Sequence, residues 1–162
     1  VYSMLPLYLV ESHNIPRPEA NSLITMSKVF TLPMPFVIGW VSDRVGLKST
    51  LAAVLFLTGC STVSIGWLDS ALVKMIIFPQ SLLAVCFFPP AFAALSRIGS
   101  PKMRNILISF TIPVAFLLGG GVVPKIIGWL GDHGRFSMGF IVFGVMICLG
   151  SAIPGFLRFY KE

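Results

Sequence analysis

The sequence predicts an all-α membrane protein, a polytopic bundle of six transmembrane helices. Hydrophobic residues make up 56% of the chain and charged residues only 11%, whereas soluble domains carry roughly a quarter charged residues. The apolar residues form long continuous runs, unlike the short alternating segments of transmembrane barrels. Because backbone polar groups in lipid must be satisfied within the protein, we expect these runs to be helices.

Six apolar stretches are expected to cross the bilayer as one transmembrane domain covering residues 1–162. A spanning helix needs about 20 residues, but the first stretch has only ten, so we interpret it as truncated at its N-terminus. Pro16 and Pro18 are expected to separate it from the second stretch. The expected spans are approximately 1–10, 22–41, 49–68, 71–95, 105–130 and 136–159.

Basic residues concentrate on one side of these spans. The stretches that follow the second, fourth and sixth spans contain Arg44, Lys48, Arg97, Lys102, Arg104, Arg158 and Lys161. The opposite loops contain two basic residues and four acidic ones: Arg17, Arg135, Glu11, Glu19, Asp69 and Asp132. Because short Lys- and Arg-rich loops stay in the cytoplasm, we expect a cytoplasmic C-terminus and a plasma (inner) membrane location. The net charge of +6 is attributed to this bias, and no nucleic-acid partner is expected.

The segment Gly39 to Lys48, which reads GWVSDRVGLK, follows the second expected span. It resembles the loop signature of the major facilitator superfamily, G-x-x-x-D-R-x-G-x-K/R, although Leu47 stands where the family often has a basic residue. In that family the loop latches one conformation of a transporter. The resemblance therefore implies a gating loop, with Arg97 at a neighbouring helix end, made of Gly39, Asp43, Arg44, Gly46 and Lys48.

Several residues of this segment have an expected physical role. Gly39 is expected to let a neighbouring helix approach closely, and Gly46 to permit a tight turn between two helices. Asp43 and Arg97 are both expected at the inner ends of helices, so the sequence predicts an ion pair between them. Such a surface pair contributes only about 0–1 kcal/mol, enough to bias a conformational equilibrium.

The position of the signature indicates which half of a family member this chain resembles. The loop occurs twice in the family, and here four further spans follow it, which fits family helices seven to twelve. The resemblance implies a missing N-terminal six-helix half as partner. A close-packed, bendable helix such as family helix eleven is suggested by Gly119, Gly120, Gly121, Pro124 and Gly128, although generic membrane packing explains them equally well.

The resemblance implies a small-molecule substrate held near the bilayer midplane between the two halves. Lys28 is expected about 10 Å inside the second span, where it holds an anionic group or snorkels to the outer interface. Gln80 either bonds the substrate or a neighbouring helix. Tyr2 is expected to face the cavity, and Tyr8 is interpreted as an interfacial anchor.

Prolines are expected to distort two of the helices. Phe87 and Phe88 precede Pro89 and Pro90, and two consecutive prolines remove backbone donors and kink a helix. The aromatic pair then forms a gate or cavity wall, or the kink serves packing alone. Pro33 and Pro35 likewise predict a bend in the second span.

The leading functional hypothesis is a secondary active transporter of a small solute that works by alternating access. Lys28 favours an organic anion, while the many Phe and Met residues leave efflux of drug-like amphipathic compounds open. A non-transporting six-helix module and a channel are also compatible with the sequence. An enzyme is not expected, because the chain has no H-E-x-x-H or G-x-S-x-G motif. No cofactor or metal site is expected, and the three cysteines are interpreted as small apolar helix residues.

Overall fold

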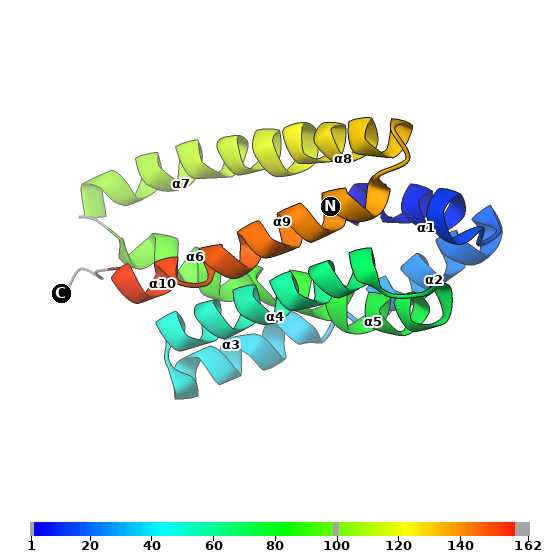
Figure 1. Ribbon diagram of the computed structural model, residues 1–162. Coiled ribbons are helices and arrows are strands. Elements are labelled where there is room, and N and C mark those ends of the chain that lie inside the picture. The colour runs from blue at the N-terminus through cyan, green and yellow to red at the C-terminus, as the bar shows by residue number, and fades with distance from the viewer. Residues whose placement is uncertain (1, 99–100, 158–162) are drawn as a thin grey trace.

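The computed structural model describes residues 2–98 and 101–157, and the described residues form helices joined by short turns. The helices run roughly side by side along one direction (Figure 1). This arrangement confirms the all-α class. In chain order the elements are η1 (Tyr2–Met4), α1 (Leu5–His13), α2 (Arg17–Val29), α3 (Met34–Val45), α4 (Leu47–Trp67), α5 (Ser70–Cys86), α6 (Phe88–Arg97), α7 (Pro101–Phe116), η2 (Leu117–Val122), α8 (Val123–Asp132), α9 (Phe136–Gly150) and α10 (Ile153–Phe156).

Several helices are long and apolar enough to cross a membrane. Among the described residues these are Leu47–Trp67, Ser70–Arg97, Asn105–Asp132 and Phe136–Phe156. The pair α2 and α3 is a further candidate, bent by 47° at its break. This bend is where Pro33 and Pro35 predicted one.

Two expected boundaries at the beginning of the chain differ from the structure. Helix α1 continues to His13, and α2 already begins at Arg17. Pro18 lies in the first turn of α2, where its fixed φ is compatible with a helix and its missing N–H is not needed. It therefore begins a helix, whereas the sequence analysis placed it in a loop.

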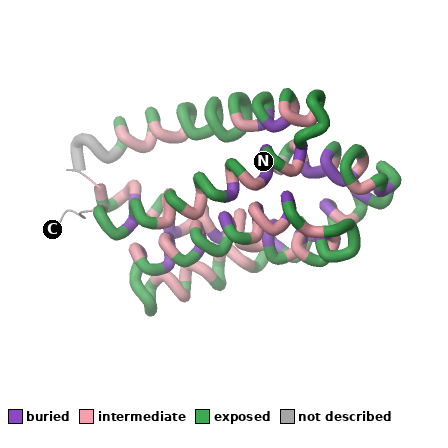
Figure 2. Tube along the Cα trace, viewed as in Figure 1, coloured by how far each residue is buried: buried purple, intermediate pink, exposed green. Residues whose placement is uncertain are grey.

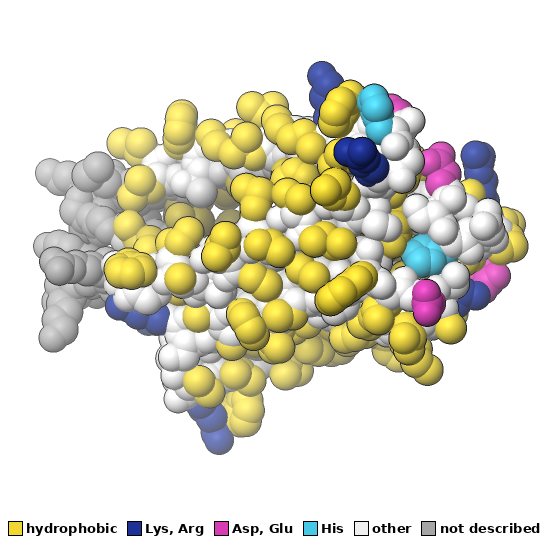
Figure 3. Space-filling view, viewed as in Figure 1, with side chains coloured by type: hydrophobic (Ala, Val, Ile, Leu, Met, Phe, Trp, Pro, Cys, Tyr) yellow, Lys and Arg dark blue, Asp and Glu magenta, His cyan; other side chains and the backbone are white. Residues whose placement is uncertain are grey.

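The turns of the bundle alternate between its two ends. The α1–α2, α4–α5 and α8–α9 turns lie at one end, while the α3–α4 turn and α10 lie at the other (Figure 1). On the face seen in Figure 3, charged side chains gather at the ends and hydrophobic side chains cover the length between them. This distribution fits a bundle that spans an apolar layer.

The closest packing in the fold joins α4 to α9. A Cβ atom added to Gly59 would lie 2.7 Å from the backbone nitrogen of Cys148 and 2.8 Å from the carbonyl oxygen of Gly144. A Cβ atom on Gly144 would lie 2.7 Å from the backbone nitrogen of Val63. The two backbones are thus in direct contact. Small residues commonly allow this kind of approach between membrane helices.

Tyr8 connects α1 to this helix pair. Its side chain is only 1% exposed, and its hydroxyl donates a hydrogen bond to the carbonyl oxygen of Ile65, 2.8 Å away. Ile65 is in the last turn of α4, where carbonyl groups lack helical partners. The ring also packs on Phe140 of α9, with centroids 4.5 Å apart. The expectation that Tyr8 anchors the chain at the membrane interface was therefore wrong, because the hydroxyl has a buried acceptor.

The fifth expected span lies along one edge of the bundle. No residue in its most apolar window is buried among the described residues, and Figure 2 shows residues 105–116 of α7 and the helix η2 as largely exposed. Cβ atoms on Gly119, Gly120 and Gly121 would meet nothing within 4 Å. Pro124 of the same span is buried, but the expectation of close packing is wrong at these three glycines among the described residues. Their segment instead forms the π-helix η2, a widened helical turn.

His13 lies at the end of α1 against α5. Its Nδ1 is 3.2 Å from the Ser70 hydroxyl, and its ring contacts the Tyr8 ring edge-on at 4.9 Å. Burial lowers the pKa of the imidazole below its ordinary 6.5, and the nearby charge of Asp69 partly offsets this effect. The fold therefore favours neutral His13.

The α4–α9 contact predicts that Gly144→Ala destabilises the protein. The added methyl group would press on the α4 backbone, and overpacking of this kind costs about 1–3 kcal/mol. We expect a lower thermal unfolding midpoint in detergent, followed by intrinsic fluorescence. Gly150→Ala is the matched control, because a Cβ atom there meets nothing within 4 Å. Equal midpoints for the two variants would show that the helices do not touch at Gly144.

The environment of His13 predicts a loss of stability in mild acid. Because the unfolded imidazole takes up a proton more readily than the folded one, stability is complete above pH 6.5 and declines as the pH falls below it. Unfolding midpoints measured between about pH 7 and pH 5 should decrease. His13→Gln should flatten this dependence, while His133→Gln, which changes an exposed histidine, should retain it. An unchanged slope in His13→Gln would contradict the assignment.

Candidate functional site

A polar seam lies between α2 and α5. The hydroxyl oxygens of Ser27 and Ser81, both nearly inaccessible, are 3.0 Å apart. Each also lies within hydrogen-bonding distance of a carbonyl oxygen of its own helix, that of Ile24 for Ser27 and that of Ile77 for Ser81. The seam thus fixes the register of the two helices at this depth.

Gln80 is the neighbour of Ser81 in this seam. Its side chain is only 3% exposed, and its amide oxygen has no hydrogen-bond partner among the described residues. A hydrogen bond from a neighbouring helix to this oxygen is thus not seen in the described part of the chain. Leaving a buried acceptor unsatisfied costs about 1–3 kcal/mol. A hydrogen bond from another molecule would satisfy this oxygen if the neighbouring helices opened, since the oxygen is inaccessible in the present arrangement. Nε2 of His13 is likewise buried without a partner among the described residues.

The depth of Gln80 in the bundle is also informative. It lies ten residues after Ser70, the first residue of α5, which corresponds to about 15 Å along a helix. The hydrocarbon core of a bilayer is about 30 Å thick. Gln80 is therefore near the middle of its span.

Lys28 lies at the same level as this seam. It follows Ser27, whose hydroxyl meets Ser81, and its backbone carbonyl accepts a hydrogen bond from the Thr31 hydroxyl at 2.6 Å. Since α2 begins at Arg17, Lys28 is about 16 Å along its helix, and about 9 Å from Ser22, where the second span was expected to begin. The side chain is exposed on the surface of the described chain.

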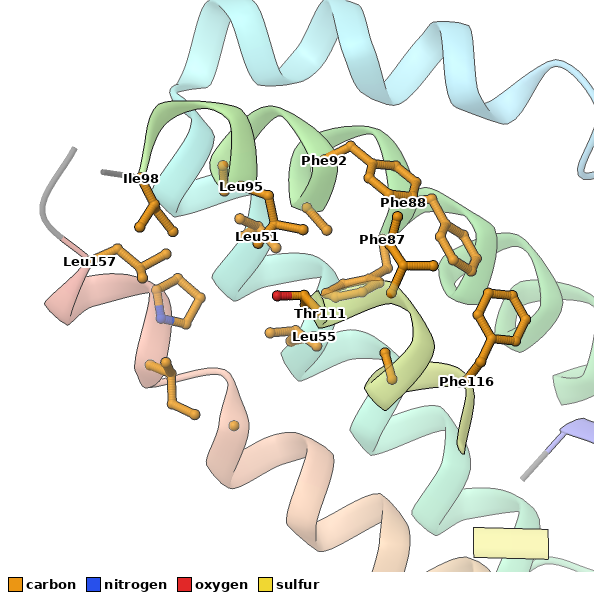
Figure 4. Close-up of a pocket in the computed structure, with 17 residues that line it drawn as sticks. Leu51, Leu55, Phe87, Phe88, Phe92, Leu95, Ile98, Thr111, Phe116 and Leu157 are labelled. Atoms are coloured by element: carbon orange, nitrogen blue, oxygen red, sulfur yellow. The ribbon is translucent and has the colours of Figure 1, made fainter. Parts of the chain in front are cut away.

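An apolar cavity of about 470 Å³ lies closer to the other end of the bundle. Figure 4 shows it between α4, α6, α7 and α10, with Phe87, Phe88 and Phe92 on one side. The break between α5 and α6 at Phe87 is where Pro89 and Pro90 predicted one, since neither proline can donate a helical hydrogen bond. Phe88 stacks near Phe92 with ring centroids 6.3 Å apart.

The structure thus divides the predicted substrate residues between two places. Phe87 and Phe88 line the apolar cavity, whereas Lys28 and Gln80 do not. The side chain of Tyr2 lies outside the described residues. Sequence reasoning overlooked Ser27, although Ala20, Ile24 and Ser27 recur at the spacing of one helix face, which is the buried face of α2.

The connection between α3 and α4 is a single residue, Gly46. Its φ of 99° and ψ of 142° are a conformation that side-chain-bearing residues rarely adopt. Its N–H donates to the Ser42 carbonyl at 3.1 Å, and its own carbonyl accepts from the Thr50 N–H and hydroxyl at 3.0 Å. The structure thus confirms the tight turn predicted at Gly46.

Other features of this loop differ from expectation. Asp43 and Arg97 form no ion pair within 4 Å, and the ion pair seen among the described residues is Glu19 with Lys74. The Arg44 guanidinium instead lies 4.2 Å from the centroid of the Trp40 ring, an attractive contact between cation and aromatic face. Both Asp43 and Arg97 are exposed, so water can solvate their charges separately. Lys48, just inside α4, is half-buried.

Gly39 does not serve a close helix contact in the described structure. A Cβ atom there would meet nothing within 4 Å. The predicted approach of a neighbouring helix is therefore wrong among the described residues, because α3 runs along the outside of the bundle at this point (Figure 1).

Comparison with known protein families agrees with this architecture of apolar helices. The family model of the Major Facilitator Superfamily matches residues 1–162. No curated protein and no solved structure matches the chain. Members of this family are transporters that carry solutes across membranes. Because the family model covers the entire chain, the chain is an integral membrane protein that belongs to the Major Facilitator Superfamily, a family of transporters.

Proposed function

We propose that this chain is the second six-helix half of a secondary active transporter that moves a small solute by alternating access. The observation that carries this proposal is the unpartnered amide oxygen of Gln80, buried at mid-span among the described residues. Solute sites of such transporters lie near the bilayer midplane, at the interface of two repeats. The N-terminal half would complete the site, and the polar seam of α2 and α5 would contribute one wall.

The chemistry of the seam indicates the class of solute. The Gln80 oxygen requires a hydrogen-bond donor, such as a hydroxyl, amine or amide N–H. Lys28, at the same level, offers an ammonium group, and a charge at this depth is costly and commonly functional. An organic anion that also carries a hydrogen-bond donor satisfies both groups.

The two spans that carry these residues are both interrupted. Lys28 precedes the 47° bend between α2 and α3, and Gln80 precedes the break at Phe87. Residues at such breaks can absorb changes of backbone angle. Because a single residue, Gly46, joins α3 to α4, a displacement of α3 would also move the first turn of α4. We therefore assign gating to the segment Gly39 to Lys48, on the cytoplasmic side of the plasma (inner) membrane.

A second candidate function is efflux of amphipathic compounds. The observation that favours it is the aromatic, almost wholly apolar cavity beside Phe87 and Phe88. An apolar compound would be held there by burial of its surface. In that case neither Lys28 nor Gln80 would contribute to recognition.

Substitutions at the polar seam distinguish the two functions. In the complete transporter reconstituted in liposomes, Lys28→Ala and Gln80→Leu should each reduce uptake of anionic solutes. A hydrogen bond to a charged group contributes about 1.5–3 kcal/mol, so Lys28→Ala should weaken kcat/KM about 10- to 100-fold. Lys28→Arg should retain more of the uptake than Lys28→Ala.

Lys125→Ala is the matched control, since Lys125 is an exposed lysine of α8. It should transport as well as the unmodified protein. If transport of every anion tested is unaffected by Lys28→Ala and Gln80→Leu, the anion proposal is wrong. If Phe88→Ala alone reduces transport, and only of amphipathic compounds, efflux is the function.

A further inference from the structure

Two free thiol groups meet across the α4–α9 interface. The sulfur atoms of Cys60 on α4 and Cys148 on α9 are 3.9 Å apart. Cys60 is exposed on the surface of the bundle, and Cys148 is half-buried, with its thiol 3.7 Å from the carbonyl oxygen of Phe56. Both residues lie within candidate membrane spans, so this surface faces lipid, which a hydroperoxide must enter to reach the thiols. An S–S bond measures about 2.05 Å, so the sulfur atoms need to approach by only about 1.9 Å.

The glycine contacts of these helices hold the two thiols together. Gly59 directly precedes Cys60, and a Cβ atom on Gly59 would collide with the Cys148 sulfur and lie 2.7 Å from its backbone nitrogen. The backbones on both sides are therefore already in contact. Bond formation then requires the two sulfur atoms to move toward each other.

We propose that Cys60 and Cys148 are an oxidation site, where a hydroperoxide converts the thiol pair into a disulfide that joins α4 to α9. With hydrogen peroxide, the exposed Cys60 sulfur attacks one peroxide oxygen, so that an S–O bond forms, the O–O bond breaks and water leaves. The Cys148 sulfur then attacks the Cys60 sulfenic acid, the S–S bond forms and a second water leaves. Two thiols lose two electrons and two protons, and one peroxide is reduced to two waters.

Cys86 provides an internal comparison. It is buried on α5 and is only 2% exposed. Among the described residues, the cysteine sulfur contact is that of Cys60 with Cys148. Because oxidation requires both access and a nearby second thiol, Cys86 should remain reduced under conditions that link the other two.

The test uses the complete transporter in membrane vesicles, treated with hydrogen peroxide. Remaining thiols are blocked with N-ethylmaleimide, and the protein is digested without reductant and analysed by mass spectrometry. We expect a peptide pair joined through Cys60 and Cys148, at least about ten-fold more abundant than any link to Cys86, and lost after dithiothreitol. Cys86→Ser should leave the yield within about two-fold, whereas Cys60→Ser and Cys148→Ser should abolish it.

A second measurement follows the intermediate. In Cys148→Ser, the Cys60 sulfenic acid has no thiol partner and should accumulate as its dimedone adduct, at least about five-fold above the unmodified protein. Equal adduct in the two proteins would overturn the proposal, because Cys148 would then not capture Cys60. Links between Cys60 residues of two copies, or links to Cys86 at equal yield, would also overturn it.

Discussion

Direct backbone contact between α4 and α9 is the constraint on which the remaining arrangement depends. In a bilayer, lipid tails are as apolar as leucine, so helices associate through close packing and hydrogen bonds with little hydrophobic driving force. Gly59, Gly66 and Gly144 let these two helices approach until backbone atoms touch. Tyr8 of α1 then reaches both helices at once, through the Ile65 carbonyl and the Phe140 ring. With α4 fixed, α5 packs against it and presents its polar side chains to α2.

Buried polar groups in the described part of the chain differ in whether they have a hydrogen-bond partner within it. The Tyr8 hydroxyl satisfies a carbonyl group in the last turn of α4, and the Ser27 and Ser81 hydroxyls satisfy each other and their own helices. These groups are complete without a further molecule. The Gln80 oxygen has no such partner among the described residues, and unsatisfied polar groups are costly in a low-dielectric interior. This contrast is the physical reason for proposing solute recognition at Gln80, which is deeper in its helix than His13 Nε2, the other unsatisfied atom among the described residues.

Local features of this chain could be predicted from sequence, whereas its tertiary contacts could not. Continuous apolar runs predict helices because lipid leaves the backbone few alternatives, and Gly46 predicts a turn because positive φ favours glycine. In the sequence, the glycines at positions 39 and 119–121 indicate a possible close helix contact just as Gly59 and Gly144 do. Among the described residues, another backbone passes close to Gly59 and Gly144 but not to the other four. Likewise, nothing near Tyr8 in sequence indicates that Ile65 lies beside it, 57 residues later.

The division between continuous and interrupted helices links stability to transport. Helices α4 and α9 have no internal proline, and they form the close-packed pair. The stretches that carry Lys28 and Gln80 are interrupted by proline-associated breaks beyond each residue. A transporter must hold its fold while its solute contacts change position. Interruptions in α4 or α9 would separate the glycine contacts, but interruptions after Lys28 and Gln80 leave those contacts intact. The breaks beyond Lys28 and Gln80 therefore lie outside the α4–α9 contact, which fits the solute-binding role proposed for these two residues.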